Sequence, residues 1–161
     1  MKRGSTLFLK VVILLIGIGV FAGMLWEPQV EGRNANATDR ISIYFNDPFL
    51  AYAYVASIPF FVALYQAFKL LGYIDKNKIF SQAAVKAVRN IKYCATTLVA
   101  FIGAAEAYLF IAVRGKDDIA GGVAMGLFII FVSAVIATAA AVFQKLLQNA
   151  VDIKSENDLT V

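Results

Sequence analysis

Histidine is absent from this 161-residue sequence, and cysteine occurs only once. Without histidine there can be no histidine-based catalytic triad or histidine zinc site, and a single cysteine excludes internal disulfides and paired-cysteine redox motifs. Charged residues are also scarce, at 16%, whereas hydrophobic residues make up 60%. A water-soluble domain carries about 25% charged residues. The composition therefore predicts a membrane protein and leaves few routes to enzymatic chemistry.

Catalytic sequence signatures are missing as well. The chain contains no HExxH metal motif, no GxSxG nucleophile elbow and no GxxxxGK[ST] phosphate loop. Cys94 has no histidine to activate it, and we interpret it as a small packing residue. We expect a protein that is not an enzyme and that carries no cofactor or metal.

Long apolar runs are what the sequence has in abundance. Four of them are about 20 to 25 residues long, enough for a helix to cross a hydrocarbon core of about 30 Å. They cover residues 7–26, 49–71, 93–113 and 119–143. A cleaved signal peptide is the alternative for the first run, but that run is long and ends at Trp26, a residue typical of membrane interfaces. The pattern predicts an all-α membrane protein, a single domain folded as a four-helix transmembrane bundle.

Lysine and arginine are unevenly distributed between the connecting segments. Eleven lie in or next to the N-terminal segment, the loop 72–92 and the tail 144–161, whereas four lie in the loop 27–48 and the short third connection. Positively charged residues accumulate on the cytoplasmic side of membrane proteins. We therefore expect both termini and the loop 72–92 in the cytoplasm, and the loop 27–48 outside.

Helical spacing continues past two of the spans on the predicted cytoplasmic side. Ala84 and Val88 precede the third span, and Leu147 and Ala150 follow the fourth, all at helical spacing. Ser81 is a suitable N-cap for the third helix. We expect helices 3 and 4 to extend into the cytoplasm, where their ends either pack on each other or form a platform for a partner.

The first predicted external loop and the start of the second span contain three local signals. Residues 41–44 alternate between apolar and polar side chains, which predicts a short strand. Asp47 followed by Pro48 is typical of a helix N-cap with proline in the first turn. Pro59 lies inside the second span and predicts a kink there.

Small residues recur at four-residue spacing in three of the spans. Close packing of membrane helices depends on such residues, because they let two backbones approach. They predict helix contacts within one chain or between copies, so an oligomer is an alternative. The patterns are Gly19/Gly23, Gly103/Ala107, Gly122/Gly126 and Ser133/Ala137/Ala141.

Glu106 is the most informative single residue. It lies about 10 Å below the predicted outer edge of the third span, and depth counting places Tyr54, Ser57 and Gly126 in the same layer. A carboxylate that faced lipid would be costly, so we expect Glu106 to face the protein interior and to be protonated or hydrogen-bonded, with Tyr54 or Ser57 supplying a hydroxyl. Either it fixes helix packing, or it binds a proton, a cation or a ligand group.

The two ends of the chain resemble a known family. The opening Met1–Val12 (MKRGSTLFLKVV) and the closing residues are similar to an uncharacterised bacterial family of four-helix inner-membrane proteins, domain of unknown function 2975. The closing residues are Glu156, Asn157, Asp158, Leu159, Thr160 and Val161. The family has no established activity. The resemblance implies a multi-pass protein of the bacterial cytoplasmic (inner) membrane.

Two function classes follow from these observations. Genes of the family often neighbour those of small helix-turn-helix transcriptional regulators, so the resemblance implies a cytoplasmic regulator as partner, without direct contact to nucleic acid. The acidic closing segment 156–161 is the candidate docking tail. The alternative is a small proton- or cation-coupled transporter or channel that uses Glu106.

Overall fold

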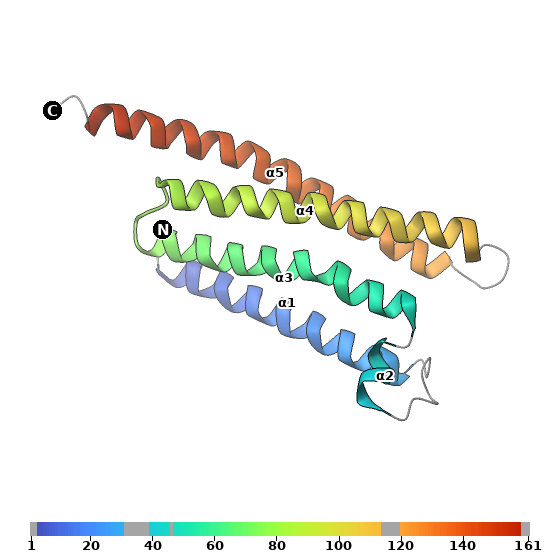
Figure 1. Ribbon diagram of the computed structural model, residues 1–161. Helices are drawn as coiled ribbons and strands as arrows, with labels where there is room; N and C mark the ends of the chain where they lie inside the picture. The colour runs from blue at the N-terminus through green and yellow to red at the C-terminus, as the bar shows by residue number, and fades with distance from the viewer. Residues whose placement is uncertain (1–2, 31–38, 46, 114–119, 159–161) are drawn as a thin grey trace.

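Four long helices make up most of the described part of the chain (Figure 1), and each is long and apolar enough to span a membrane. The sequence-based prediction of four such helices is confirmed. The computed structural model describes residues 3–30, 39–45, 47–113 and 120–158. In chain order the elements are α1 (Arg3–Val30), α2 (Arg40–Phe45), α3 (Pro48–Asp75), α4 (Gln82–Tyr108), the π-helical turn η1 (Leu109–Val113) and α5 (Ala120–Asp158).

The long helices lie side by side in the order α1, α3, α4, α5 (Figure 1). Each packs against the next, and α4 and α5 share the most extensive interface. Within the described residues, no extensive contact joins α1 to α4 or to α5. The helices therefore form an open layer, in which each helix packs on the next, and the four-helix arrangement expected from the sequence has this form.

One end of this layer gathers three parts of the chain. The start of α1, the turn between α3 and α4, and the end of α5 lie together at the left of Figure 1, while α2 lies at the opposite end. The described parts of the N-terminal segment, of the loop 72–92 and of the tail, residues 144–158, thus share one end. These are the segments in which the sequence concentrates lysine and arginine.

The predicted strand at residues 41–44 is wrong, because these residues form part of the helix α2. A strand without a neighbour leaves its backbone groups unpaired, whereas a helical turn pairs them locally. α2 also packs onto α3 through aromatic rings. The ring centroids of Tyr44 and Phe45 lie 6.3 and 5.6 Å from that of Tyr54.

The start of α3 follows the sequence prediction. Asp47 caps the helix, and its side chain accepts hydrogen bonds from the backbone N–H groups of Phe49 at 2.7 Å and Leu50 at 3.3 Å. Pro48 occupies the first turn, where a missing N–H costs nothing. Pro59 lies inside α3, and the helix is continuous through it.

The turn from α3 to α4 is a tight C-terminal cap. The backbone N–H of Lys78 donates to the carbonyl of Tyr73 at 2.8 Å, and that of Asn77 donates to Ile74 at 3.0 Å. This is the pattern of a Schellman motif, which requires a left-handed residue. Asn77 supplies it with a φ of 54°, a conformation that asparagine tolerates better than most residues.

The N-cap of α4 is Ser81, as predicted. Its hydroxyl oxygen accepts from the N–H of Ala84 at 3.3 Å, and its hydroxyl donates to the carbonyl of Lys78 at 2.7 Å. From Gln82 the helix runs without a break to Tyr108 and then continues as η1. The expected extension of the third helix before residue 93 is therefore present.

The α4–α5 interface is built from small side chains at a regular spacing. α5 buries one residue in every seven: Gly126, Ser133, Ala140 and Leu147. A seven-residue repeat keeps one seam of a helix against its partner, as in a left-handed coiled coil. The buried residues of α4 include mostly small and β-branched side chains, namely Ala84, Val85, Ala87, Val88 and Ala95.

The extensions of α4 and α5 pack on each other. Val85 and Val88 of α4 form a buried cluster with Ala140 and Leu147 of α5, and the partly buried Leu70, Ile79, Ile91 and Val151 surround it. Of the two alternatives for these ends, the structure shows mutual packing as far as Val151. The part of α5 beyond that residue projects past the start of α4 (Figure 1).

Candidate functional site

Glu106 lies in the α4–α5 interface and is only 8% exposed. Its Oε2 atom is buried and has no hydrogen-bond partner among the described residues. The side chain thus faces a neighbouring helix, as the sequence predicts. Among those residues, no hydroxyl bonds to Oε2, although we expected one from Tyr54 or Ser57 to the carboxyl group.

Gly126 of α5 makes the space for this carboxyl group. A methyl group at position 126 would overlap Oε1 and come within 2.7 Å of the carboxyl carbon of Glu106. One turn away, a methyl group at Gly122 would meet Leu109 at an ordinary 3.9 Å. The predicted layer containing Glu106 and Gly126 is therefore correct, and any side chain at position 126 competes with the carboxyl group for the same volume.

Tyr54 and Ser57 do not join this site, so their predicted role as hydroxyl donors to Glu106 is wrong. The Tyr54 hydroxyl donates to the carbonyl of Met24 in α1 at 3.0 Å, and the Ser57 hydroxyl donates to the carbonyl of Tyr54 at 2.7 Å. Both residues line a cavity of about 530 Å³ bordered by α1, α2 and α3. Tyr54 and Ser57 have the same predicted membrane depth as Glu106, but they do not lie beside α5, because α4 separates α3 from α5 in the open layer.

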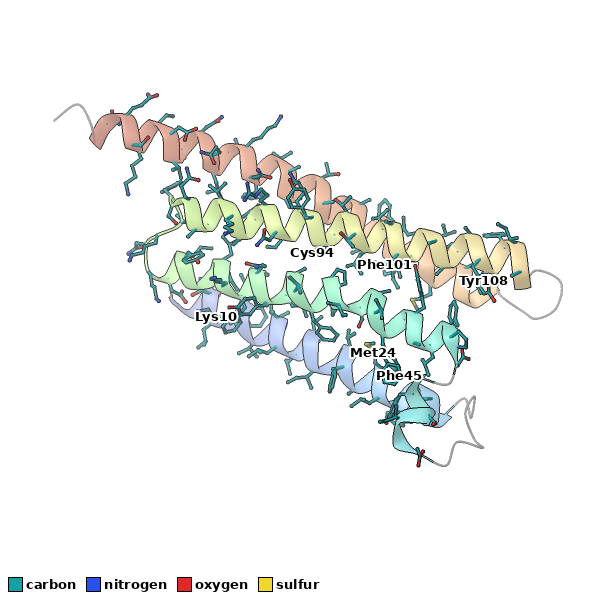
Figure 2. The ribbon with its side chains drawn as sticks, viewed as in Figure 1. Lys10, Met24, Phe45, Cys94, Phe101 and Tyr108 are labelled. Atoms are coloured by element: carbon teal, nitrogen blue, oxygen red, sulfur yellow. The ribbon has the colours of Figure 1, made fainter. Side chains whose placement is uncertain are left out.

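Tyr52 of α3, which the sequence did not assign to this site, contacts α4 five residues before Glu106. Tyr52 donates its hydroxyl to the carbonyl of Phe101 at 2.7 Å, and the two rings pack edge to face at 5.8 Å. Tyr52 also lines a cleft of about 300 Å³ between α3 and α4, together with Ala104 and Tyr108. Figure 2 shows Phe101 and Tyr108 along the C-terminal half of α4.

The surroundings of Glu106 are poor in charge. Residues 120–143 of α5 contain no ionisable side chain. Among the described residues, no group of three histidine, cysteine, aspartate or glutamate side chains could hold a metal ion. Within the described part of α4 and of residues 120–143, the ionisable group that the site offers is therefore the carboxyl group of Glu106.

Two polar contacts between helices near the other end of the layer were also missed. The ammonium group of Lys10 forms an ion pair with Asp75, which joins α1 to α3. Lys92 donates to the side-chain oxygen of Gln144 at 2.9 Å, which joins α4 to α5. Sequence reasoning treated both lysines as topology signals, and no spacing rule relates residues 65 positions apart.

The candidate docking tail continues α5. α5 remains helical through Asp158, and Asp152, Glu156 and Asn157 are exposed. Gln148 donates to the carboxylate of Asp152 at 2.8 Å. Leu159, Thr160 and Val161 lie outside the described residues.

Comparisons with known proteins give a family but no activity. Residues 32–161 match a family model described as "Protein of unknown function (DUF2975)". The chain is 51% identical over 162 residues to the uncharacterised membrane protein YoaS of Bacillus subtilis (strain 168), and the alignment covers 100% of both chains. No solved structure matches the chain. With these similarities and four helices suited to a membrane, the protein belongs to the DUF2975 family of membrane proteins of unknown function.

Proposed function

We propose that this protein is a non-enzymatic, multi-pass protein of the bacterial cytoplasmic membrane that binds a cytoplasmic protein through the projecting end of α5. A small helix-turn-helix regulator is the proposed partner class. The observation that carries the proposal is the course of α5 beyond Val151. Residues 152–157 are all exposed, although the preceding turns pack on α4.

The length of α5 supports a projection from the membrane. The helix has 39 residues, which at about 1.5 Å each is about 58 Å, nearly twice the about 30 Å of a hydrocarbon core. Because residues 120–143 are the apolar part, the excess lies at the C-terminal end. That end presents the exposed Asp152 and Glu156 against Lys154, so it offers an acidic helical surface to a basic partner.

The eleven-to-four distribution of lysine and arginine supports a cytoplasmic position for this end. Single cysteines placed at Ala37 and at Lys154, in a chain whose Cys94 is replaced by alanine, test the orientation in intact cells. A membrane-impermeant thiol reagent is expected to label position 37 and not position 154. Labelling at position 154 would overturn the cytoplasmic docking proposal.

Co-purification tests the docking itself. The full chain and a chain that lacks residues 156–161 are expressed at equal levels, and the retained proteins are identified by mass spectrometry. The full chain is expected to retain a regulator that the shortened chain loses, because the acidic turn is removed. Glu106→Gln is the matched control, since it removes one carboxylate far from the tail. Equal retention by the full and shortened chains would contradict the proposal, as would no specific retention by either.

A transporter or channel that uses Glu106 is the second candidate, and the unpartnered Oε2 atom favours it. We propose that this carboxyl group binds the transported proton or cation, because its Oε2 atom has no hydrogen-bond partner among the described residues. Glu106→Gln keeps the shape and removes the exchangeable acid. If the variant in proteoliposomes folds normally and loses a proton or cation flux that the parent shows, transport is supported. An unchanged flux, or none in the parent, would reject it.

A further inference from the structure

The boundary between α1 and α3 contains an apolar groove that is independent of the α5 docking surface. It has a volume of about 600 Å³ and opens to the outside of the layer, where Leu14 and Ile18 are 52% and 64% exposed. Gly17 forms part of its floor, since a methyl group there would already meet Leu64 at 3.4 Å. We call it the α1–α3 groove. It is lined by Ile13, Leu14, Gly17, Ile18 and Phe21 of α1 and by Phe61, Leu64, Tyr65 and Phe68 of α3.

The groove has the length of one leaflet of a bilayer. From Lys10 to Phe21, the eleven intervening steps of α1 rise about 16 Å, and half of a hydrocarbon core is about 15 Å. At its deep end, the rings of Phe21 and Phe61 pack edge to face at 6.3 Å. An extended acyl chain that enters beside Lys10 would therefore reach this ring pair.

Positive charge is concentrated at the shallow end of the groove. The Lys10 ammonium group, which pairs with Asp75, lies 5.6 Å from the centre of the Phe68 ring. The Lys69 ammonium group lies 6.0 Å from the centre of the Tyr65 ring, and Lys69 is exposed. Figure 2 shows Lys10 toward the end of α1 that lies beside the α3–α4 turn, opposite Met24 and Phe45. Two ammonium groups thus lie beside rings that line the groove, and one of them, that of Lys10, is paired with Asp75.

We propose that the α1–α3 groove binds one anionic phospholipid, with an acyl chain along the groove and the phosphate at Lys69. The apolar walls match the chain, and the excess cation matches a headgroup of net negative charge. Lys69 is the residue that selects the headgroup, because Lys10 is already paired with Asp75. This groove differs from the rest of the lipid-facing surface in two ways. It is walled by α1 on one side and by α3 on the other, and its ammonium groups lie at one end.

Mass spectrometry of the intact protein, released from detergent micelles, tests this site. The probes are phosphatidylglycerol and phosphatidylcholine with identical acyl chains, added in equal amounts. We expect one phosphatidylglycerol molecule to remain bound under conditions that strip phosphatidylcholine. Equal retention of the two lipids would overturn the role of charge, and retention of free palmitate in place of phospholipid would overturn the choice of ligand.

Three variants locate the bound lipid. Lys69→Gln is expected to weaken phosphatidylglycerol binding about fivefold, the effect of about one lysine near an anionic lipid surface. Lys86→Gln on α4 is the matched control, an exposed lysine away from the groove, and it should leave binding unchanged. Leu14→Trp fills the groove from an exposed position and should lower binding of both lipids. Equal losses for Lys69→Gln and Lys86→Gln, or full binding by Leu14→Trp, would overturn the site.

Discussion

The most apolar parts of α1 and α5 have the same mean hydropathy, yet they pack very differently. Among residues 7–26 of α1, none is buried within the chain, whereas α5 buries Gly126, Ser133, Ala140 and Leu147. The hydropathy of both segments is high enough for a helix that spans a membrane. It does not distinguish a helix at the lipid-facing edge of the layer from a helix that holds the layer together.

The difference lies in where small residues point. The small residues of α5 face the alanine-rich side of α4, so the two backbones approach closely. α1 also has glycines, but a methyl group at Gly19 or Gly23 would meet no atom within 4 Å. α1 instead contacts α3 through bulky side chains such as Phe21, which leave the α1–α3 groove between them. Small residues promote packing only when a partner surface lies opposite them.

The largest expected loss of stability follows from enlarging Gly126 in the α4–α5 interface. Gly126→Ala places a methyl group in the volume of the Glu106 carboxyl group, so we expect a loss of about 1 to 3 kcal/mol in the free energy of unfolding, as for other overpacked sites. Gly23→Ala is the matched control. It meets no neighbour and replaces a glycine within a helix, so it should be neutral or slightly stabilising. Denaturation in mixed detergent micelles measures both, and equal effects would contradict the packing described here.

A double-mutant cycle tests whether Gly126 acts through its contact with Glu106. If Gly126→Ala acts through the Glu106 carboxyl group, then Glu106→Ala vacates the space, and the second substitution should cost less in that background. Residues in direct contact commonly couple by about 0.5 to 3 kcal/mol. The four unfolding free energies of the cycle give the coupling energy. Simple additivity of the two substitutions would show that Gly126 is needed for another reason.

The ion pair between α1 and α3 should contribute least. The side chains of Lys10 and Asp75 are 21% and 27% exposed, so water screens part of their attraction. We expect Lys10→Gln to lower the unfolding free energy by less than about 1 kcal/mol, in the range of partly exposed pairs. Lys86→Gln serves as the unpaired surface control. A loss as large as that of Gly126→Ala would mean that the α1–α3 boundary depends on this ion pair rather than on side-chain packing.

Local signals in the sequence predicted local structure well. The caps at Asp47 and Ser81 are present because each depends on a side chain and on backbone groups within three residues. The strand prediction at residues 41–44 failed because a strand depends on a neighbouring segment, which the local sequence does not reveal. Alternation describes one surface of an extended segment, but a strand forms only where a neighbour accepts its hydrogen bonds.

The candidate site was predicted in part. Burial of Glu106 and its proximity to Gly126 followed from depth counting on two helices joined by a short connection, which must be neighbours. The same counting misplaced Tyr54 and Ser57, because depth says nothing about lateral position. The Lys10–Asp75 pair was missed for the same reason, since it depends on which helix lies beside α1.

Sequence alone determined the number of long apolar helices, the N-caps of α3 and α4 and the uneven distribution of lysine and arginine, because run length, capping groups and lysine positions are local properties. Only the tertiary structure decided the order α1, α3, α4, α5, the close approach of Glu106 to Gly126 and the open α1–α3 groove. Lateral order depends on which faces fit together. In lipid, where no hydrophobic force drives helices together, that choice depends on the shapes of opposing side chains, which hydropathy does not describe.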